Sequence, residues 1–398
     1  MALLNPHFEE LRTEYIFPVI EEKLEALKTE YPHCKIINLG IGDIALPLAS
    51  SIISSICEAV IEMGNPESMR GYGPSTGYPF LKEAIRNHEY AHLGIQPDEI
   101  FISDGINSDI VNIQDLFSSE NTVAICNPTY PAYLDASVMN GRKNKVIFLP
   151  LKEENNFSPL PPDELVNLVY LCSPNNPVGL AMTNKELKIW VDWAKKNGAI
   201  LFYDNAYCSF ITSTDVPKSI FEIEGAKEVA IEMKSFSKTA GFTGLRCGYT
   251  VLPKSVKASL NGNSISLHPL WTRRQNSKFN GVAYPIQKGA LAVYTEEGRE
   301  ETQKQILHYL EAGKILKEGL TKQGYRSFGG TDAPYIWWKV PSGLTSWQFF
   351  DLLLKKCQLL AIPGVGFGSE GEGYIRLSCF TTPEIAQEAI QRILQINL

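Results

Sequence analysis

One short segment near the middle of the chain carries the side chains best suited to chemistry. An apolar run at residues 229–233 leads into Ser235, Ser237 and Lys238, and a glycine-rich turn then brings Arg246. Two hydroxyl donors and a guanidinium fork suit a phosphate dianion, because they can make charged hydrogen bonds to it in a fixed geometry. The lysine amine on the same turn could form a Schiff base with an aldehyde. The pattern therefore indicates a pyridoxal phosphate site with Lys238 as its catalytic residue. S-x-S-K also occurs at ordinary strand ends, so the rest of the chain must support this interpretation.

Short apolar runs recur along the chain between stretches with helical patterns. Runs that are apolar on both faces are typical of a parallel sheet covered by helices on each side. One helical stretch, 184–196, is expected to be capped by Thr183 or Asn184 and to stop at Gly198. The alternation predicts an α/β fold with a mixed, mostly parallel sheet. The expected strands are residues 99–103, 122–126, 145–149, 168–172, 199–203 and 229–233.

Polar side chains follow these runs at the points where the strands would end. Asp104-Gly105 follows the first run, Asn127 to Tyr130 the second, Ser173 to Asn176 the fourth and Asp204 the fifth. In open α/β sheets, ligands bind outside the carboxyl ends of the strands, where loops and helix N-termini converge. The set predicts a ligand crevice at that edge of the sheet.

Four of these polar and aromatic residues match parts of a pyridoxal ring. Asp204 would lie against the pyridine nitrogen, where a carboxylate keeps that nitrogen protonated and the ring electron-accepting. Asn176 and Tyr207 can donate hydrogen bonds to the phenolate oxygen. Tyr130 offers an aromatic face to the ring.

Further groups are expected at the two ends of the bound molecule. The backbone amides of Ile106 and Asn107, at an expected helix start, would join the two serines and the arginine around the phosphate. Tyr72 could reach the phosphate from a partner subunit. Arg376, on the last expected strand, is the candidate clamp for a substrate carboxylate, where a planar fork binds better than a lysine.

Length and composition predict a protein of two domains. The 398 residues, 44% of them apolar, exceed what one hydrophobic core usually covers. A net charge of −7 and the lack of a Lys/Arg-rich run argue against nucleic-acid binding. No stretch reaches the ~18 apolar residues of a membrane span, and no secretory leader pattern opens the chain. The eight cysteines are dispersed without a C-x-x-C pair. We therefore expect a cytoplasmic location, no membrane partner and reduced thiols.

The pattern of helical and strand-like stretches changes near Gly298. A long helical stretch ends at Gly324, and strand-like and helical stretches alternate after it. This alternation predicts a smaller α/β domain, which the N-terminal residues would join. The predicted domains are a large cofactor-binding domain, 48–285, and a discontinuous small domain, 1–47 with 286–398.

Several motifs together resemble those of one enzyme family. The chain resembles the fold-type I, class I/II aminotransferases and, within them, the LL-diaminopimelate aminotransferases. The resemblance implies a pyridoxal-phosphate-dependent transaminase of amino-acid metabolism, with a role in lysine biosynthesis. It rests on Asn38-Leu39-Gly40-Ile41-Gly42-Asp43, Tyr72-Gly73-Pro74, Ser173-Pro174-Asn175-Asn176-Pro177-Val178-Gly179, Ser235-Phe236-Ser237-Lys238, Phe279-Asn280-Gly281 and Tyr374-Ile375-Arg376.

The resemblance also implies an assembly and further site residues. It implies a homodimer with the site at the subunit interface, where Tyr72 and Asn280 come from the neighbouring subunit. Tyr15 and the backbone of Gly42 would line the substrate pocket. The other residues expected to touch substrate are Asn107, Tyr130, Asn176 and Arg376.

Two positions depart from the family's pattern. Asn107 stands where members usually carry a lysine expected to contact substrate, and Ser75 stands where they tend to carry an acid. An unpaired buried charge costs on the order of 3 to 5 kcal/mol, so both changes bear on which substrate is accepted. The expected reaction moves an amino group between a long or basic amino acid and 2-oxoglutarate. The alternatives are a diverged member that acts on lysine or another amino acid, and a pyridoxal phosphate lyase.

Two other motifs suggest different chemistry. His88-Glu89-Tyr90-Ala91-His92 matches the H-E-x-x-H pattern of zinc proteases, on a helical stretch from Leu81 that would put both imidazoles on one face. No third ligand follows at a convincing spacing, so we expect no metal. The residues from Gly73 to Gly77 fit G-x-S-x-G, but no apolar strand leads into them, which argues against a hydrolase.

Overall fold

The structure is a computed structural model that describes residues 1–11 and 16–395. Its largest element is a seven-stranded sheet in which β8 runs antiparallel to its two neighbours and the other strands are parallel. This confirms the predicted α/β fold with a mixed, mostly parallel sheet. In spatial order the strands are β2 (Ile100–Ser103), β8 (Gly248–Val251), β7 (Ala230–Ser235), β6 (Ile200–Asp204), β5 (Leu168–Cys172), β3 (Val123–Asn127) and β4 (Val146–Pro150).

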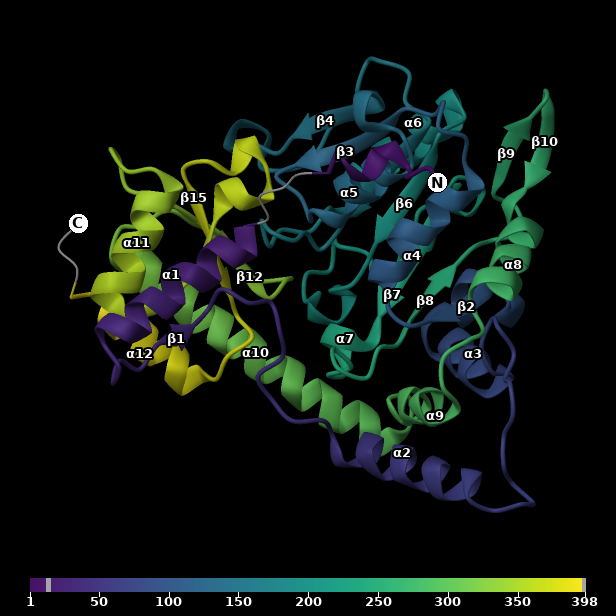
Figure 1. Cartoon of the computed structure of the whole chain (residues 1–398), viewed down its shortest axis with the longest axis horizontal. Helices are drawn as coiled ribbons and strands as arrows, with labels where there is room; N and C mark the ends of the chain where they lie inside the picture. The colour runs from purple at the N-terminus through teal and green to yellow at the C-terminus, as the bar shows by residue number, and fades with distance from the viewer. Residues whose placement is uncertain (12–15, 396–398) are drawn as a thin grey trace.

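The six predicted strands all belong to this sheet, and only β8 was not predicted. Every residue of β3, β5 and β6 is buried, because helices cover both faces of the sheet. The apolar residues of the two faces form separate core clusters. One face carries α3 (Pro79–Ile85), α6 (Asn184–Asn197) and α9 (Tyr284–Ala292), and the other carries α4 (Ile106–Asn112), α5 (Ala132–Met139) and α8 (Leu267–Lys278) (Figure 1).

The capping signals around α6 work as predicted. The Thr183 hydroxyl accepts a hydrogen bond from the Glu186 amide, and the Glu186 carboxylate accepts one from the Thr183 amide, which completes a capping box. Gly198 ends the helix with φ 66°, a left-handed conformation that favours glycine.

A second, smaller sheet forms from the C-terminal part of the chain. Its strands are antiparallel in the order β11 (Ser327–Gly329), β12 (Tyr335–Lys339), β15 (Tyr374–Ser378) and β14 (Ile362–Pro363). The N-terminal strand β1 (Ile37–Asn38) pairs with β13 (Leu359–Leu360). The core beneath these strands also contains residues of α1 (Ile16–Glu30), α11 (Ser346–Cys357) and α12 (Pro383–Ile393).

Three further elements connect or extend these units. The 27-residue helix α10 (Glu296–Lys322) packs against α12 at one end and α2 (Ser50–Met63) at the other (Figure 1). The predicted domain boundary at 285 falls within α9, which itself packs on α2. The division into domains therefore stays a prediction. A hairpin of β9 (Lys257–Leu260) and β10 (Asn263–Ser266) projects from the large unit.

Candidate active site

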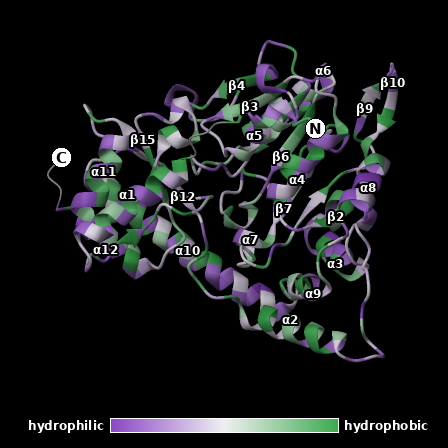
Figure 2. Ribbon diagram, in the orientation of Figure 1, coloured by the Kyte–Doolittle hydropathy of each residue, from purple (hydrophilic) through white to green (hydrophobic). Residues whose placement is uncertain are grey.

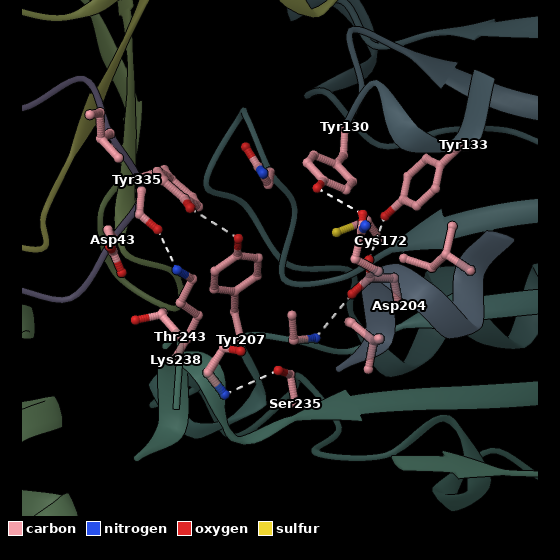
Figure 3. Close-up of a pocket in the computed structure, with 18 of the residues that line it drawn as sticks. Asp43, Tyr130, Tyr133, Cys172, Asp204, Tyr207, Ser235, Lys238, Thr243 and Tyr335 are labelled. Atoms are coloured by element: carbon pink, nitrogen blue, oxygen red, sulfur yellow. Dashed lines mark hydrogen bonds between the residues drawn. The ribbon is translucent and has the colours of Figure 1, made fainter. Parts of the chain in front are cut away.

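A cavity of ≈ 410 Å³ lies at the carboxyl ends of β5, β6 and β7, where the sequence predicted a crevice (Figure 3). It brings together most of the predicted site residues. Those that line it are Gly42, Ile106, Asn107, Tyr130, Asn176, Asp204, Tyr207, Ser235, Ser237, Lys238, Arg246 and Arg376.

Two of the predicted site residues that the structure describes do not line this cavity. Tyr72 is 96% exposed and Asn280 is also exposed, so neither touches the site within one copy of the chain. Tyr15 lies outside the described residues. Their proposed roles stay predictions.

Lys238 lies on the one-turn helix α7 (Phe236–Thr239) that directly follows β7. Its Nζ donates a hydrogen bond to the backbone oxygen of Gly42 and lies 5.2 Å from the centre of the Phe380 ring. The pKa of Lys238 is lowered to about 8, mainly by burial; Asp43 opposes this shift, while Arg376 and Arg246 contribute to it. A substantial fraction of this amine is therefore neutral just above neutral pH, as a nucleophile or base requires.

The side chains suited to a phosphate gather beside that lysine. Ser235 and Ser237 are both buried, and the Ser235 hydroxyl accepts a hydrogen bond from the Ser237 amide. Arg246 has φ 61° and lies 3.5 Å from the Ser237 hydroxyl through Nη1. Gly105 has φ 116°, and a Cβ at that position would collide with Nη2 of Arg246. A glycine is thus required for the guanidinium to approach the first turn of α4, where Ile106 begins the helix.

Asp204 ends β6 and is held by two donors. The Tyr133 hydroxyl donates a 2.6 Å hydrogen bond to Oδ2, and the Ala206 amide donates to Oδ1 at 3.1 Å. Burial raises the pKa of Asp204 to about 6, and these two hydrogen bonds oppose that rise. Sequence reasoning missed Tyr133. The signal available was its position one helical turn after Tyr130, which also lines the cavity.

Arg376 is fixed on both faces and along its edge. Its guanidinium lies 4.6 Å from the centre of the Tyr335 ring and 4.7 Å from that of Phe367. Nη1 donates to the Asn176 side chain at 2.8 Å and Nη2 to the Gly40 carbonyl at 2.7 Å. Its buried Nε has no hydrogen-bond partner among the described residues. This leaves a rigid cation with spare donors, suited to a carboxylate.

Two hydrogen bonds of aromatic hydroxyls link other parts of the cavity wall. Tyr207 and Tyr335 are 2.9 Å apart at their hydroxyl oxygens, and both are buried. Tyr130 donates a 3.0 Å hydrogen bond to Asn107. Tyr335 was not predicted as a site residue, because it belongs to β12 of the small sheet, far from the cavity in sequence.

The H-E-x-x-H pattern has a structural role. The predicted helix does not continue through it: α3 ends at Ile85, and a π-helical turn follows at Arg86–Tyr90. Glu89 accepts hydrogen bonds from Lys234 at 2.8 Å, from Tyr249 at 2.8 Å and from Tyr294 at 2.5 Å. These three hydrogen bonds occupy the Glu89 carboxylate, which therefore has a structural role. Among the described residues, no three His, Cys, Asp or Glu side chains are grouped to hold a metal ion.

Within residues 1–11 and 16–395, no helix has both the length and the apolar character needed to cross a bilayer.

A family model described as aminotransferase class I and II matches residues 34–393. The chain belongs to this family. It is a transaminase, as the motifs predicted.

Full-length relatives support the assignment within the family. An LL-diaminopimelate aminotransferase of Methanosphaera stadtmanae is 45% identical over 406 residues, covering 99% of each chain. One of Parabacteroides distasonis is 46% identical over 404 residues, again with 99% of each chain covered. These relatives confirm the resemblance to LL-diaminopimelate aminotransferases.

Solved structures agree in fold. The LL-diaminopimelate aminotransferase of Chlamydomonas reinhardtii has a TM-score of 0.92 at 41% identity, over 99% of this chain and 98% of that one. The BacF structure from Bacillus subtilis has a TM-score of 0.84 at 28% identity, over 100% and 98% of the two chains. A Thermus thermophilus aspartate aminotransferase, 19% identical with a TM-score of 0.85 over 99% of each chain, supports the fold alone. The fold-type I class is therefore confirmed.

Proposed function

We propose that this transaminase binds pyridoxal 5′-phosphate in the cavity and moves an amino group between a long or basic amino acid and 2-oxoglutarate. The observation that carries the proposal is the arrangement around Lys238. A buried lysine with a lowered pKa shares one cavity with a phosphate-suited cluster, a buried carboxylate and a fixed arginine. Class I and II aminotransferases are pyridoxal phosphate enzymes, which agrees with this set.

The residues present fit the cofactor. Ser235, Ser237, Arg246 and the amides at the start of α4 would hold the phosphate, and Gly105 leaves the space that the Arg246 guanidinium occupies beside them. Asp204 would pair with the pyridine nitrogen, Asn176 and Tyr207 with the phenolate oxygen, and Tyr130 with a face of the ring. The buried Nε of Arg376, which has no hydrogen-bond partner among the described residues, is a spare donor of the kind that a carboxylate requires.

Bound pyridoxal phosphate supplies an aldehyde carbon and an electron-accepting ring. In the proposed reaction the Lys238 amine would hold the cofactor and, once released by the incoming amino acid, Nζ would accept the proton of the substrate's Cα and then donate it back to the cofactor–substrate pair. Arg376 binds the α-carboxylate and so fixes which substrate bond faces the lysine. The buried surroundings exclude water from the amine while it acts as base and then as acid.

The substrate class rests on the relatives and on two side chains. The relatives at 45% and 46% identity are named for LL-diaminopimelate, a long amino acid with two amino groups. Asn107 lies at the cavity and accepts from Tyr130, so it offers an amide where a lysine is usual. Ser75 is hydrogen-bonded to Asn276 in this copy of the chain. We therefore keep lysine as an alternative donor, and a lyase reaction as an alternative outcome at the same site.

We also propose that the active form is a homodimer in the cytoplasm. Helix α2 exposes an apolar surface that includes Ile53, Val60 and Ile61, and its hydrophobic residues are visible at the lower edge of the molecule (Figure 2). Tyr72 follows this helix and is 96% exposed, an unusual state for a large aromatic side chain. A second copy covering this surface would bring Tyr72 and Asn280 to the neighbouring cavity.

The cofactor proposal is tested by a reduction experiment. Borohydride treatment of the purified protein should leave a phosphopyridoxyl group on the peptide that contains Lys238, and the visible absorbance should be lost. Lys238→Ala should show neither the adduct nor transamination. Full activity in that variant would refute the proposal.

The substrate proposal is tested by a panel of amino donors with 2-oxoglutarate. The panel contains LL-diaminopimelate, lysine, ornithine, glutamate and an aromatic amino acid. We expect the highest kcat/KM with LL-diaminopimelate or lysine. A clear preference for aspartate or for small apolar donors would contradict it, and ammonia release without an acceptor would indicate the lyase.

A further inference from the structure

A buried arginine lies behind the cavity without lining it. Arg142, in the turn after α5, is 1% exposed and takes part in no ion pair described for residues 1–11 and 16–395. Its guanidinium donates instead to the carbonyls of Phe117 and Ser118 and to the side-chain oxygen of Gln114. A buried cation paired only with neutral oxygens is costly unless those oxygens hold it well.

Arg142 fixes the orientation of the Gln114 amide. A guanidinium carries donors only, so the Gln114 oxygen must face it and the amide nitrogen must face away. That nitrogen donates to the Tyr170 hydroxyl at 2.9 Å and to the Ser137 hydroxyl at 3.2 Å. Both hydroxyls are then free to donate onward. Tyr170 donates to the Ile110 carbonyl and Ser137 to the Tyr133 carbonyl, each at 2.8 Å.

These contacts reach the cavity wall at Ile110, whose carbonyl accepts from Tyr170, and at Tyr133. The rings of Tyr133 and Tyr170 are stacked, with centres 4.8 Å apart and planes at 11°. The Tyr133 backbone is held by Ser137, and its hydroxyl donates to Asp204 at 2.6 Å (Figure 3). We call Arg142, Gln114, Tyr170, Ser137 and Tyr133 the Arg142 array. Of its members, only Tyr133 lines the cavity.

We propose that the Arg142 array is a positioning device that holds Asp204 in place, as an ionised carboxylate, for the cofactor's ring nitrogen. The inference rests on the proposed function, because it takes Asp204 as the partner of that nitrogen. The array also joins α4, α5 and β5, the last of which carries Tyr170. Gln114 follows α4, which begins at the expected phosphate site, and Tyr133 lies on α5, which follows Tyr130.

The electrostatic effect follows from the surroundings of Asp204. Burial favours the protonated form of a carboxyl group, and a donated hydrogen bond favours the ionised form. The Tyr133 hydroxyl supplies that donor, and the stack and Ser137 keep it aimed. Without this hydroxyl, a larger fraction of Asp204 is protonated near neutral pH, and a neutral acid does not keep the ring nitrogen charged.

The test is the affinity of the apoprotein for pyridoxal phosphate as a function of pH. Tyr133→Phe removes the hydroxyl and keeps the ring stack. We expect affinity to fall roughly tenfold near pH 7, as for the loss of a hydrogen bond to a charged group, and the difference to shrink at higher pH. Tyr170→Phe should shift affinity in the same direction by a smaller factor.

Tyr90→Phe is the matched control. Tyr90 donates a 2.5 Å hydrogen bond to Glu232, another fully buried carboxylate, but neither residue lines the cavity. This variant should lose a similar amount of thermal stability and keep wild-type affinity at every pH.

The outcomes distinguish a failure of the proposed function from a failure of the positioning role. If the wild-type protein binds no pyridoxal phosphate, the proposed function fails. If the wild type binds it while Tyr133→Phe and Tyr170→Phe bind with the same affinity and pH dependence, the positioning role is overturned. If Tyr90→Phe weakens binding as much as Tyr133→Phe does, the effect is general destabilisation and the inference is also overturned.

Discussion

Arg376 donates a 2.8 Å hydrogen bond to the side-chain oxygen of Asn176 and so joins β15 of the small sheet to the loop after β5 of the large one. The rings of Tyr335 and Phe367 lie against the two faces of the same guanidinium. The arginine therefore cannot rotate freely, and its unused donors keep one direction. A carboxylate that binds there meets a preformed site.

We predict that Arg376→Lys lowers kcat/KM for the amino donor by roughly 10- to 100-fold, because a hydrogen bond to a charged group contributes about 1.5 to 3 kcal/mol. The loss should appear mainly in KM, with the affinity for pyridoxal phosphate almost unchanged. Arg392→Lys is the control, since Arg392 also donates to carbonyls and pairs with Glu388, but on α12 away from the cavity. Steady-state kinetics measure kcat and KM for the amino donor in both variants. An unchanged KM in Arg376→Lys would count against the carboxylate clamp.

Gly105→Ala should weaken pyridoxal phosphate binding. The residue has φ 116°, and its new Cβ would displace the Arg246 guanidinium. A backbone strain of about 1 to 3 kcal/mol corresponds to a loss of affinity of roughly 5- to 150-fold if the strain is relieved by moving the phosphate cluster. Gly198→Ala is the matched change: φ is 66° and no atom lies within 4 Å of the added Cβ, so stability should fall without a change in affinity. Equal affinities for Gly105→Ala and the wild type would show that this cluster does not hold the phosphate.

The stability of the apoprotein should respond to pH through Asp204. Its pKa is raised from 3.8 to about 6, so the folded state disfavours the ionised form, and stability is lost as pH rises from about 4 through about 6. Asp204→Asn removes this dependence. Relative to the wild type, the variant should therefore gain on the order of 3 kcal/mol in unfolding free energy between pH 4 and pH 7. Denaturant unfolding at the two pH values measures the gain, and a pH-independent difference would contradict the raised pKa.

Mixing two inactive variants tests the shared site. If Tyr72 acts in the partner's cavity, a heterodimer of Tyr72→Ala and Lys238→Ala contains one intact site. After random reassociation, activity should return to about a quarter of the wild-type value, as expected for a two-fold symmetric dimer. Mixing Lys238→Ala with Asp204→Asn should restore nothing, because both residues line the same cavity of one chain. If activity does not return in the first mixture, Tyr72 does not act in the partner's site.

Most of the large sheet and of its polar edge could be predicted from sequence. The apolar runs that became β2, β3, β5, β6 and β7 are strands buried on both faces, which leaves a local signal in the sequence, whereas β4 is a partly exposed edge strand. Asp204 and Lys238 follow such strands directly, so the sheet itself brings them to one edge. The prediction for the H-E-x-x-H helix was wrong: a π-helical turn stands there, and its Glu89 pairs with Lys234 on a distant strand, a contact that leaves no local signal in the sequence.

The sequence by itself therefore determined which residue types stand at the ends of the strands, and with them the family and the lysine. The tertiary structure alone decided what surrounds these groups. Tyr335 and Phe367 reach Arg376 from other segments of the small unit, and Arg142 is linked to Asp204 through Gln114, in the turn after α4, and through residues of α5 and β5. Such contacts leave no period or spacing along the chain, because they depend on how separately folded segments pack against one another.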